Sequence, residues 1–446
     1  MPHPQPTNHI PCPETDLCAN LDRKDGRLRF AGQDTIALAR TYGTPLYLMD
    51  EDRIRHNCRL YTQAFQRCFP GGSRVLYASK AAAFRQMCRI VREEGLGLDA
   101  VSPGEIHTAR TAGFPMDLVY YHGNNKTDED IAYAMDAGVG CFVVDGVEEL
   151  LALEAEAGRR DVRQKVLLRI TPGIDPHTYA AVSTGQVDSK FGVSIETGQA
   201  GSFVRLALAQ PHLYVAGFHC HVGSQVFWED VFERSVLVMM AFIRRIRDDC
   251  GYLPEELDLG GGYGVRYVQS DPIVNIPQKI ASVAETLENI ARRLSLPVPR
   301  ILMEPGRSIV ANAGMTLYTV GSVKEITGYK RYVSIDGGMS DNPRYALYGS
   351  RYTCFNAGRM DEPGDMIADL VGRCCESGDV IQPDVPFPHA TKRGDVVAVC
   401  TTGAYNFSMA SGYNRMLRPP LVMLRGGASY VAVKGETLDD LVRLDV

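Results

Sequence analysis

Continuous apolar runs alternate with segments of helical period from about residue 75 to about residue 305. Runs that are apolar on both faces and separated by helices are typical of a parallel sheet covered by helices. Eight repeats of this unit predict a closed (β/α)₈ barrel, with a doubly wound open sheet as the alternative. The eight runs are VLYAS from 75, LGLDAVS from 96, LVYYHG from 118, CFVVD from 141, VLLRITP from 166, VAGFHCHVGS from 215, ELDLGGG from 256 and RILMEPG from 300.

The helical period is clear between the first two of these runs. Phe84, Met87, Cys88 and Val91 recur at the spacing of one helix face, and the pattern stops at Gly95. Apolar positions three and four residues apart predict an amphipathic helix, and a glycine is a common helix end. This segment therefore predicts one β-α-β unit of the barrel.

The pattern changes after about residue 310, where β-branched, partly alternating runs are separated by Gly and Pro rather than by helices. Such runs indicate an antiparallel β-rich domain. Near the N-terminus GRLRFAGQD predicts a strand with a turn, and we expect the first 45 residues to join this second domain. The predicted division is a barrel of residues 46–310 and a β domain of residues 1–45 together with residues 311–446.

Composition and charge narrow the class of protein. The 446 residues are 45% hydrophobic and 22% charged, which is ordinary for a globular chain and excludes collagen, coiled coil and disorder. The net charge of −6, without blocks of like charge, argues against nucleic acid or an anionic membrane as the partner. The longest apolar run, at 236–243, is far below the ~20 residues of a membrane helix. The N-terminus has no signal-peptide pattern, and we expect a soluble cytoplasmic protein.

Twelve cysteines are spread along the chain and none forms a C-x-x-C pair. In a chain of this length the pattern is typical of reduced thiols rather than of disulfides. It gives no support to zinc binding, and no metal site is predicted.

Chemically active residues follow several of the predicted strands, at the barrel end where active sites lie. Gly260, Gly261 and Gly262 follow the seventh strand, and Arg307 follows the eighth. A glycine run is by itself often only a turn. Because loops after the last two strands form the phosphate site of many barrels, these residues predict a phosphate-bearing ligand.

Lys80 follows the first strand, between apolar residues on both sides. A surface lysine is the usual interpretation, but these surroundings predict a dry site in which desolvation makes the amine a nucleophile. A lysine that can form an imine, a phosphate site and an acid that faces a ring nitrogen together describe a pyridoxal phosphate site. Glu304, after the eighth strand, is the candidate acid.

Two further residues lie at the end of the sixth strand. His221 is either a core histidine or a ring that lies flat against the cofactor, and Ser224 is a candidate phosphate ligand. His219 precedes His221 by two residues, shares its face, and is expected to support the site without touching the cofactor.

Ten motifs in this order resemble the diaminopimelate decarboxylase family. This family belongs to the fold-type III pyridoxal phosphate enzymes, together with ornithine and arginine decarboxylases and alanine racemase. The resemblance extends over about residues 30 to 445 and implies a barrel with a second β domain. The motifs are YASKA, GLGLDAVSPGEI, HGNNKT, STGQVDSKFG, HCHVGSQ, DLGGGYG, EPGR, DGGMSDNPRYALYG, CCESGD and TGAYNFSMASGYNR.

The resemblance implies a role for each candidate residue. Lys80 would form the imine with the cofactor, His221 would stack on its ring, and Glu304 would pair with the ring nitrogen. Cys375 would be the acid that protonates the substrate, supplied with Glu376 by the partner subunit of a homodimer. The cofactor phosphate would be held by Ser224, Gly260, Gly261, Gly262, Gly306, Arg307 and Tyr405. The substrate's distal end would be bound by Arg307, Arg344, Tyr348, Glu376 and Tyr405.

The same residues favour one reaction. An acid at the ring nitrogen makes the cofactor a strong electron sink, whereas alanine racemase is understood to place an arginine there. Arg344 and Arg307 with Tyr348 suit a distal carboxylate, which ornithine lacks, and Glu376 suits the distal ammonium. We therefore expect decarboxylation of meso-2,6-diaminopimelate to L-lysine, the last step of lysine biosynthesis.

Two alternatives remain open from the sequence. One is a related decarboxylase of another amino acid or of a carboxylated polyamine, and the other is a non-catalytic homologue that binds the cofactor. Departures from the family pattern bear on the substrate rather than on Lys80, Glu304, Cys375 or Tyr405. They are Tyr179, Ala180, Pro343, Tyr345, Cys374 and Gly412.

Overall fold

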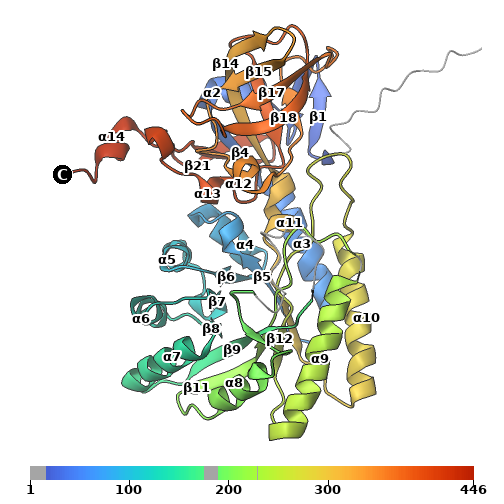
Figure 1. Cartoon of the computed structure of the whole chain (residues 1–446), viewed down its shortest axis with the longest axis vertical. Coiled ribbons are helices and arrows are strands. Elements are labelled where there is room, and N and C mark those ends of the chain that lie inside the picture. The colour runs from blue at the N-terminus through green and yellow to red at the C-terminus, as the bar shows by residue number, and fades with distance from the viewer. Residues whose placement is uncertain (1–16, 175–188, 229) are drawn as a thin grey trace, which may run out of the picture. The chain divides into compact units, whose positions relative to one another are not determined.

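The computed structural model describes residues 17–174, 189–228 and 230–446, and these form two compact units. Most of the α/β elements belong to one unit and most of the β-rich segments to the other (Figure 1). The first unit comprises Ile54–Val265 and Ile273–Val310. The second comprises the chain up to Arg53, Arg266–Pro272 and Ala311–Val446.

The first unit is a closed barrel of eight parallel strands, as the apolar runs predict. Each strand pairs with the next, and β13 returns to β5 through Leu302–Arg74 and Met303–Val75. This closure makes the open-sheet alternative wrong. The strands in barrel order are β5 (Arg74–Ala78), β6 (Gly97–Ala100), β7 (Val119–Tyr121), β8 (Cys141–Val144), β9 (Gln164–Thr171), β11 (Leu213–His219), β12 (Glu256–Asp258) and β13 (Arg300–Met303), and the short β10 (Val193–Ser194) adds to β9.

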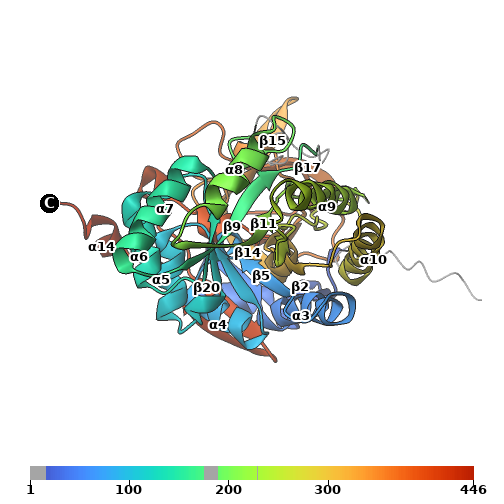
Figure 2. The same ribbon diagram turned by 90° about the horizontal axis from the view of Figure 1, so that it is seen from below.

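Helices surround these strands, as Figure 2 shows from below. The helix predicted after the first strand is α4, whose buried side includes Met87, Cys88 and Val91. The helix ends at Glu93, two residues before Gly95, which has φ of +77°. The helices are α3 (Glu51–Cys68), α4 (Arg85–Glu93), α5 (Pro103–Thr111), α6 (Asp128–Asp136), α7 (Val147–Arg160), α8 (Gln199–Leu208), α9 (Val231–Cys250), α10 (Ile276–Leu294) and α11 (Arg307–Val310).

The barrel interior is filled by side chains from different strands, including Leu76, Tyr120, Val143, Leu167 and Leu302. Because the strands are parallel, their carboxyl ends lie at one end of the barrel. The residues that follow the strands are thereby brought together on a rigid frame.

The second unit contains a mixed sheet in which antiparallel pairings predominate. Strands that are neighbours in this sheet can be far apart in the sequence. For example, β4 and β20 lie next to each other and run parallel. The strands are β4 (Leu46–Asp50), β14 (Gly314–Ile326), β15 (Lys330–Ile335), β16 (Cys354–Asn356), β17 (Met366–Val371), β18 (Val380–Phe387), β19 (Val396–Cys400), β20 (Leu421–Arg425) and β21 (Ala428–Val433). The helices are α2 (Thr35–Tyr42), α12 (Arg344–Tyr348), α13 (Asn406–Met409) and α14 (Leu438–Val442).

The predicted start of the barrel at residue 46 needs correction. Leu46–Asp50 forms β4, which pairs with β14 and β20 of the second unit rather than with any barrel strand. All five residues are buried. A buried central strand therefore has the same continuous apolar pattern in either sheet, and the pattern cannot assign it.

The N-terminal segment, from residue 17 onward, belongs to the second unit. It forms a small antiparallel sheet of β1 (Leu21–Lys24), β2 (Arg27–Phe30) and β3 (Gln33–Asp34). Leu28 and Phe30 are buried in a core shared with Leu317 of β14. The Leu28 N–H also donates to the Ala357 carbonyl at 2.8 Å.

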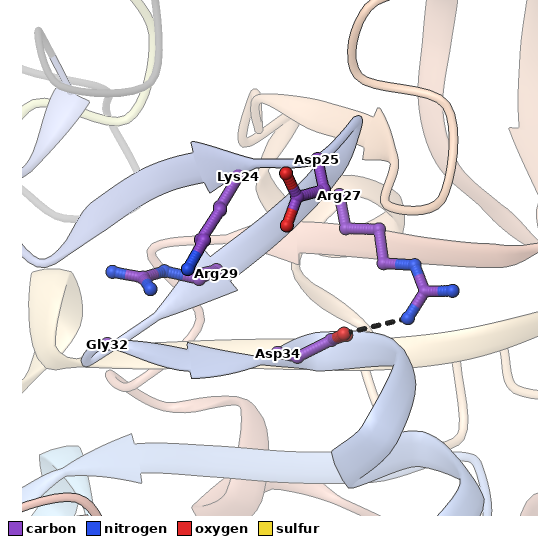
Figure 3. A pocket seen from close by; sticks show the side chains of 6 residues that line it. All are labelled: Lys24, Asp25, Arg27, Arg29, Gly32 and Asp34. Carbon is purple, nitrogen blue, oxygen red and sulfur yellow. Dashed lines mark hydrogen bonds and ion pairs between the residues drawn. The ribbon is translucent and has the colours of Figure 1, made fainter.

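A surface pocket of about 480 Å³ lies beside this small sheet, and Figure 3 shows the charged side chains that line it. Arg27 is paired with Asp34 at 3.0 Å, and Arg29 donates to Asp22 through Nε and Nη2. The pocket contains none of the predicted site residues.

No disulfide joins the eleven cysteines in the described residues, and most of them are buried; Cys12 lies outside the described residues. A search of the described helices finds none with the length and apolar character needed to cross a membrane.

Candidate active site

Lys80 lies where the first barrel strand ends, in a short 3₁₀ turn (Ser79–Ala81) that follows β5. Its Nζ donates to Oδ2 of Asp99 at 3.1 Å, and Asp99, at the end of β6, is fully buried. The predicted dry environment is wrong for this chain, because 40% of the Lys80 side chain is exposed. The amine is held by an ion pair rather than by apolar surroundings.

Glu304 follows β13 and is buried in the barrel between two histidines. Its Oε1 lies 2.8 Å from Nε2 of His122, and its Oε2 lies 3.4 Å from Nε2 of His219. The two imidazole rings meet edge to face, with centroids 5.0 Å apart. The expectation that His219 supports the site is consistent with its contact to Glu304.

A second carboxyl group, Asp258 of β12, lies beside Glu304. Burial raises the pKa of Asp258 well above its usual value, and the negative charge of Glu304 raises it further. Burial would also raise the pKa of Glu304, but the histidines outweigh it and hold that pKa well below the usual value. Asp258 therefore keeps its proton while Glu304 is ionised, because two adjacent buried carboxyl groups do not both carry charge.

Burial lowers the pKa of His219 to about 4, against the opposing effect of Glu304. Its imidazole is therefore neutral near pH 7. Because Nε2 faces a carboxylate oxygen, the proton is placed on Nε2, which donates to Glu304. Glu304 thus receives a hydrogen bond without a second buried charge.

Asp258→Asn tests this assignment through the pH dependence of stability. An asparagine matches a protonated aspartic acid in shape and can still accept from the Gly260 N–H, which lies 2.8 Å from Oδ1. Because the folded pKa of Asp258 is raised, the wild type loses stability as pH rises above the ordinary value of about 4, and the variant does not. We expect the Tm of Asp258→Asn relative to wild type to be higher at pH 7.5 than at pH 4. A Tm difference that does not change with pH would contradict a neutral Asp258.

His221 lies just after β11, as predicted, and is held by the glycine run after β12. Its Nδ1 accepts from the Gly261 N–H at 3.2 Å. Burial lowers the pKa of His221 well below its usual value, so that its ring is neutral. A Cβ on Gly260, which has φ of +68°, would come within 2.6 Å of that Nδ1. The glycine is needed for this close approach.

The glycine run needs one correction. We predicted its three N–H groups as donors to an anion, but Gly260 already donates to Asp258 and Gly261 to His221. The run also packs against neighbouring backbone, because a Cβ on Gly261 would lie 2.0 Å from the Glu304 carbonyl oxygen. These glycines allow adjacent strand ends to meet.

Three of the other predicted phosphate ligands, Ser224, Gly306 and Arg307, lie together in the barrel unit. Arg307 begins α11 and is buried, and its Nη2 donates to Oγ of Ser224 at 3.0 Å. Gly306 packs against the end of β5, where an added Cβ would lie 2.9 Å from that of Ala78. A guanidinium, a hydroxyl and the first turn of a helix are groups that bind phosphate.

These residues fit pyridoxal phosphate. At one end of the barrel they provide the amine of Lys80, the ionised carboxylate of Glu304 and the neutral imidazole of His221. Arg307 and Ser224 add a positively charged site for an anion. The buried carboxylate is the decisive feature, because an ionised acid inside the barrel suits a protonated ring nitrogen.

In the second unit, Arg344, Tyr348 and Tyr405 lie together. Arg344 begins α12 and is buried, with its guanidinium 5.2 Å from the ring centroid of Tyr348 and 5.1 Å from that of Tyr405. Tyr405 precedes α13 with φ of +71°. Nε of Arg344 is buried and has no hydrogen-bond partner among the described residues. An unpaired buried guanidinium N–H is suited to an anionic group.

Cys375 and Glu376 lie in the turn between β17 and β18 and are exposed in the single chain. The Cys375 N–H donates to Oδ1 of Asn414 at 2.7 Å. Glu376 accepts from the Tyr413 hydroxyl at 3.4 Å. The preceding Cys374 is buried, and its N–H donates to Asp379. Tyr179 and Ala180, two of the departures from the family pattern, lie outside the described residues.

The sequence profile described as "Pyridoxal-dependent decarboxylase, pyridoxal binding domain" matches residues 51–311, more than half of the chain. The chain belongs to the pyridoxal-dependent decarboxylases. Membership of this family confirms the predicted cofactor and the predicted carboxy-lyase class. The barrel described above is the part of the chain that the profile covers.

Individual pyridoxal-dependent decarboxylases resemble the chain over nearly its whole length. Diaminopimelate decarboxylase of Bacillus subtilis is 41% identical, covering 94% of this chain and 95% of its own. The Mycobacterium tuberculosis enzyme of the same name is 40% identical with the same coverage. The crystal structure of diaminopimelate decarboxylase from M. jannaschii with L-lysine has a TM-score of 0.88 at 33% identity, covering 96% of this chain and 98% of that one. The resemblance inferred from the motifs is confirmed.

Three residues of this decarboxylase site were not singled out from the sequence: Asp99, His122 and Asp258. Each lies at or directly after the end of a barrel strand. The rule that identified Lys80 and Glu304 applies to all three. They were missed because a single Asp or His in an otherwise apolar run gives no indication of its partner.

Proposed function

We propose that this chain decarboxylates meso-2,6-diaminopimelate at its D-configured centre and releases L-lysine and CO₂, the last step of lysine biosynthesis. The observation that carries this proposal is the full-length similarity to diaminopimelate decarboxylases, at about 40% identity over 94% of the chain. A decarboxylase of another amino acid is the alternative. The lysine/ornithine decarboxylase of Vibrio vulnificus gives it less support, with a TM-score of 0.74 and 26% identity.

The barrel residues would hold pyridoxal phosphate. Lys80 would bind it covalently, with Asp99 directing the amine. Ser224 and Arg307 would bind its phosphate together with the backbone of Gly262 and of Gly306, and Tyr405 would add its hydroxyl. When bound, the cofactor supplies an electron sink for the pair of electrons left at the substrate's α-carbon.

Glu304 would keep the ring nitrogen protonated, because an ionised carboxylate stabilises the cation opposite it. His221 would cover one face of the ring as a neutral imidazole, so that it excludes water without competing for protons. Arg307, paired with Ser224, would supply a fixed positive charge to the phosphate.

Cys375 would deliver a proton to the α-carbon after CO₂ leaves. Its side chain is exposed in the single chain, and its backbone is fixed by Asn414, so the thiol is free to face a substrate. We propose that it reaches the site of the partner subunit in a homodimer, together with Glu376. The free thiols of the described residues support a reducing, cytoplasmic location.

Arg344 would bind the distal carboxylate. Its guanidinium lies near the rings of Tyr348 and Tyr405, and its Nε–H has no hydrogen-bond partner among the described residues. A substrate carboxylate would accept a hydrogen bond from this group. Tyr348 would bind the same group, with Arg307 adding charge, and Glu376 would bind the distal ammonium. Ornithine has no carboxylate at its distal end to pair with Arg344, and its distal ammonium would be repelled.

A substrate comparison with Arg344→Ala and Arg344→Lys tests this proposal. We expect the wild-type holoenzyme to release CO₂ from meso-diaminopimelate with a higher kcat/KM than from ornithine, arginine or lysine. Arg344→Ala should lower kcat/KM for diaminopimelate by about 100-fold, the loss of a charged hydrogen-bonding partner, and Arg344→Lys by less. If ornithine or lysine is the better wild-type substrate, the assignment is wrong.

A further inference from the structure

Glu304 is connected to Lys80 by a continuous chain of side chains inside the barrel. Lys80 Nζ contacts Oδ2 of Asp99 at 3.1 Å, and Oδ1 of Asp99 lies 3.8 Å from Nε2 of His122. The same Nε2 lies 2.8 Å from Oε1 of Glu304. His122 thus stands between the acid beside the cofactor-binding lysine and the acid that would face the ring nitrogen.

His122 is well placed to control the direction of Glu304. It follows β7, and only 5% of its side chain is exposed. The carboxylate has two oxygens, and His219 engages the other one at 3.4 Å. A carboxylate held at both oxygens from different strands cannot rotate without losing a contact. In a buried site that loss is unfavourable, because no water replaces the donor.

The distance of 2.8 Å between Nε2 of His122 and Oε1 of Glu304 also indicates which kind of contact they make. Two ligands on one tetrahedral zinc ion, each about 2.0–2.1 Å from the metal, lie about 3.3 Å apart. The 2.8 Å separation of Nε2 and Oε1 is shorter than this and is that of a direct ion-pair contact, although its geometry is not that of a regular hydrogen bond. The buried group of His122, His219 and Glu304 is therefore better explained by direct contacts between the histidines and the carboxylate than by metal binding.

We propose that His122 is a positioning residue, which holds the Glu304 carboxylate toward the ring nitrogen of the cofactor and links it to the Asp99–Lys80 ion pair. The inference rests on the proposed role of Glu304 and adds a residue to it. His122 contacts neither substrate nor cofactor in this assignment and acts through Glu304.

The experiment compares His122→Leu, His122→Asn and His122→Gln in the full-length protein. Glutamine can place an amide N–H close to the position of Nε2, whereas asparagine is one methylene shorter and leucine has no donor. We expect the leucine and asparagine variants to bind pyridoxal phosphate about 10- to 100-fold more weakly, as for one lost hydrogen bond to a charged group, and the glutamine variant to recover most of the affinity. The readout is the dissociation constant from titration of apoprotein with the cofactor. In the holoenzymes kcat should fall while KM for meso-diaminopimelate stays near wild type.

Two further variants distinguish a failure of the inference about His122 from a failure of the proposed role of Glu304. His212→Leu removes another histidine–glutamate contact, His212 with Glu154 at 2.7 Å, and should leave cofactor affinity unchanged. Glu304→Gln tests the proposed role of Glu304, and wild-type kcat and affinity in that variant would overturn that role. If Glu304→Gln is impaired and His122→Leu is not, only the inference fails.

The double variant Glu304→Gln/His122→Leu gives the sharpest result. If His122 acts through Glu304, the double variant is no worse than Glu304→Gln alone. Losses that multiply would mean that His122 acts independently of Glu304 and would overturn the inference. Should the leucine variant fail to fold, as judged by circular dichroism, His122→Asn against His122→Gln provides the same test, and equal impairment of these two counts against positioning.

Discussion

Lys80→Ala is expected to remove both the visible absorbance of the bound cofactor and the decarboxylase activity. Lys80 directly follows the first barrel strand, and its amine pairs with the buried carboxylate of Asp99. Loss of a covalently acting residue lowers kcat by at least about 10³-fold in comparable cases. The measurement is the absorption spectrum after incubation with pyridoxal phosphate and removal of the excess, together with CO₂ release.

Lys324→Ala is a matched control, because Lys324 is an exposed lysine of β14 in the second unit. We expect this variant to keep the spectrum and the activity of the wild type. A wild-type protein that stays colourless after incubation with the cofactor would contradict the cofactor assignment. A coloured and active Lys80→Ala would contradict the role of Lys80.

Cys375→Ala is expected to bind substrate and cofactor but to turn over about 10²- to 10⁴-fold more slowly, the range for a lost general acid. KM should change little, because the thiol would act after CO₂ has left. Cys250→Ala is the control, since Cys250 is also exposed but lies at the end of α9. Wild-type kcat in Cys375→Ala would remove the proton-donor role.

A mixture of the Lys80→Ala and Cys375→Ala variants tests whether Cys375 acts in the site of the partner subunit. If the proposed homodimer shares its sites, mixing Lys80→Ala with Cys375→Ala under conditions that exchange subunits should restore part of the activity, because one site of a mixed dimer has both residues. An inactive mixture in which mixed dimers are shown to form would contradict the shared site.

Most of the barrel could be predicted from the sequence because its strands are apolar on both faces. Each of the eight runs became a strand, and helices formed between them where the apolar positions had a helical period. β4 shows the limit of this reasoning. Leu46–Asp50 has the same pattern as a barrel strand, and only its pairing with β14 and β20 identifies its sheet.

The site was predicted less completely than the fold. The strand-end rule located Lys80 and Glu304, but it gave no partners for them. His122 and Asp99 come from separate strands, and their distances to Glu304 and Lys80 exist only once the barrel closes.

The exposure and the contacts of each side chain also could not be predicted from the sequence and are known only from the structure. The apolar neighbours of Lys80 in sequence suggested a dry site, whereas its side chain extends to a partly exposed position. Two glycine N–H groups expected to bind an anion are instead bonded to Asp258 and His221. Sequence neighbours do not determine which groups meet across a barrel.

The most direct test of the proposed function is the product formed from pure meso-2,6-diaminopimelate by the holoenzyme. CO₂ is measured together with lysine, and the lysine is resolved by chirality. We expect equimolar CO₂ and L-lysine, at a rate above that with ornithine or arginine. Absence of L-lysine, or faster release of CO₂ from ornithine or arginine, would contradict it.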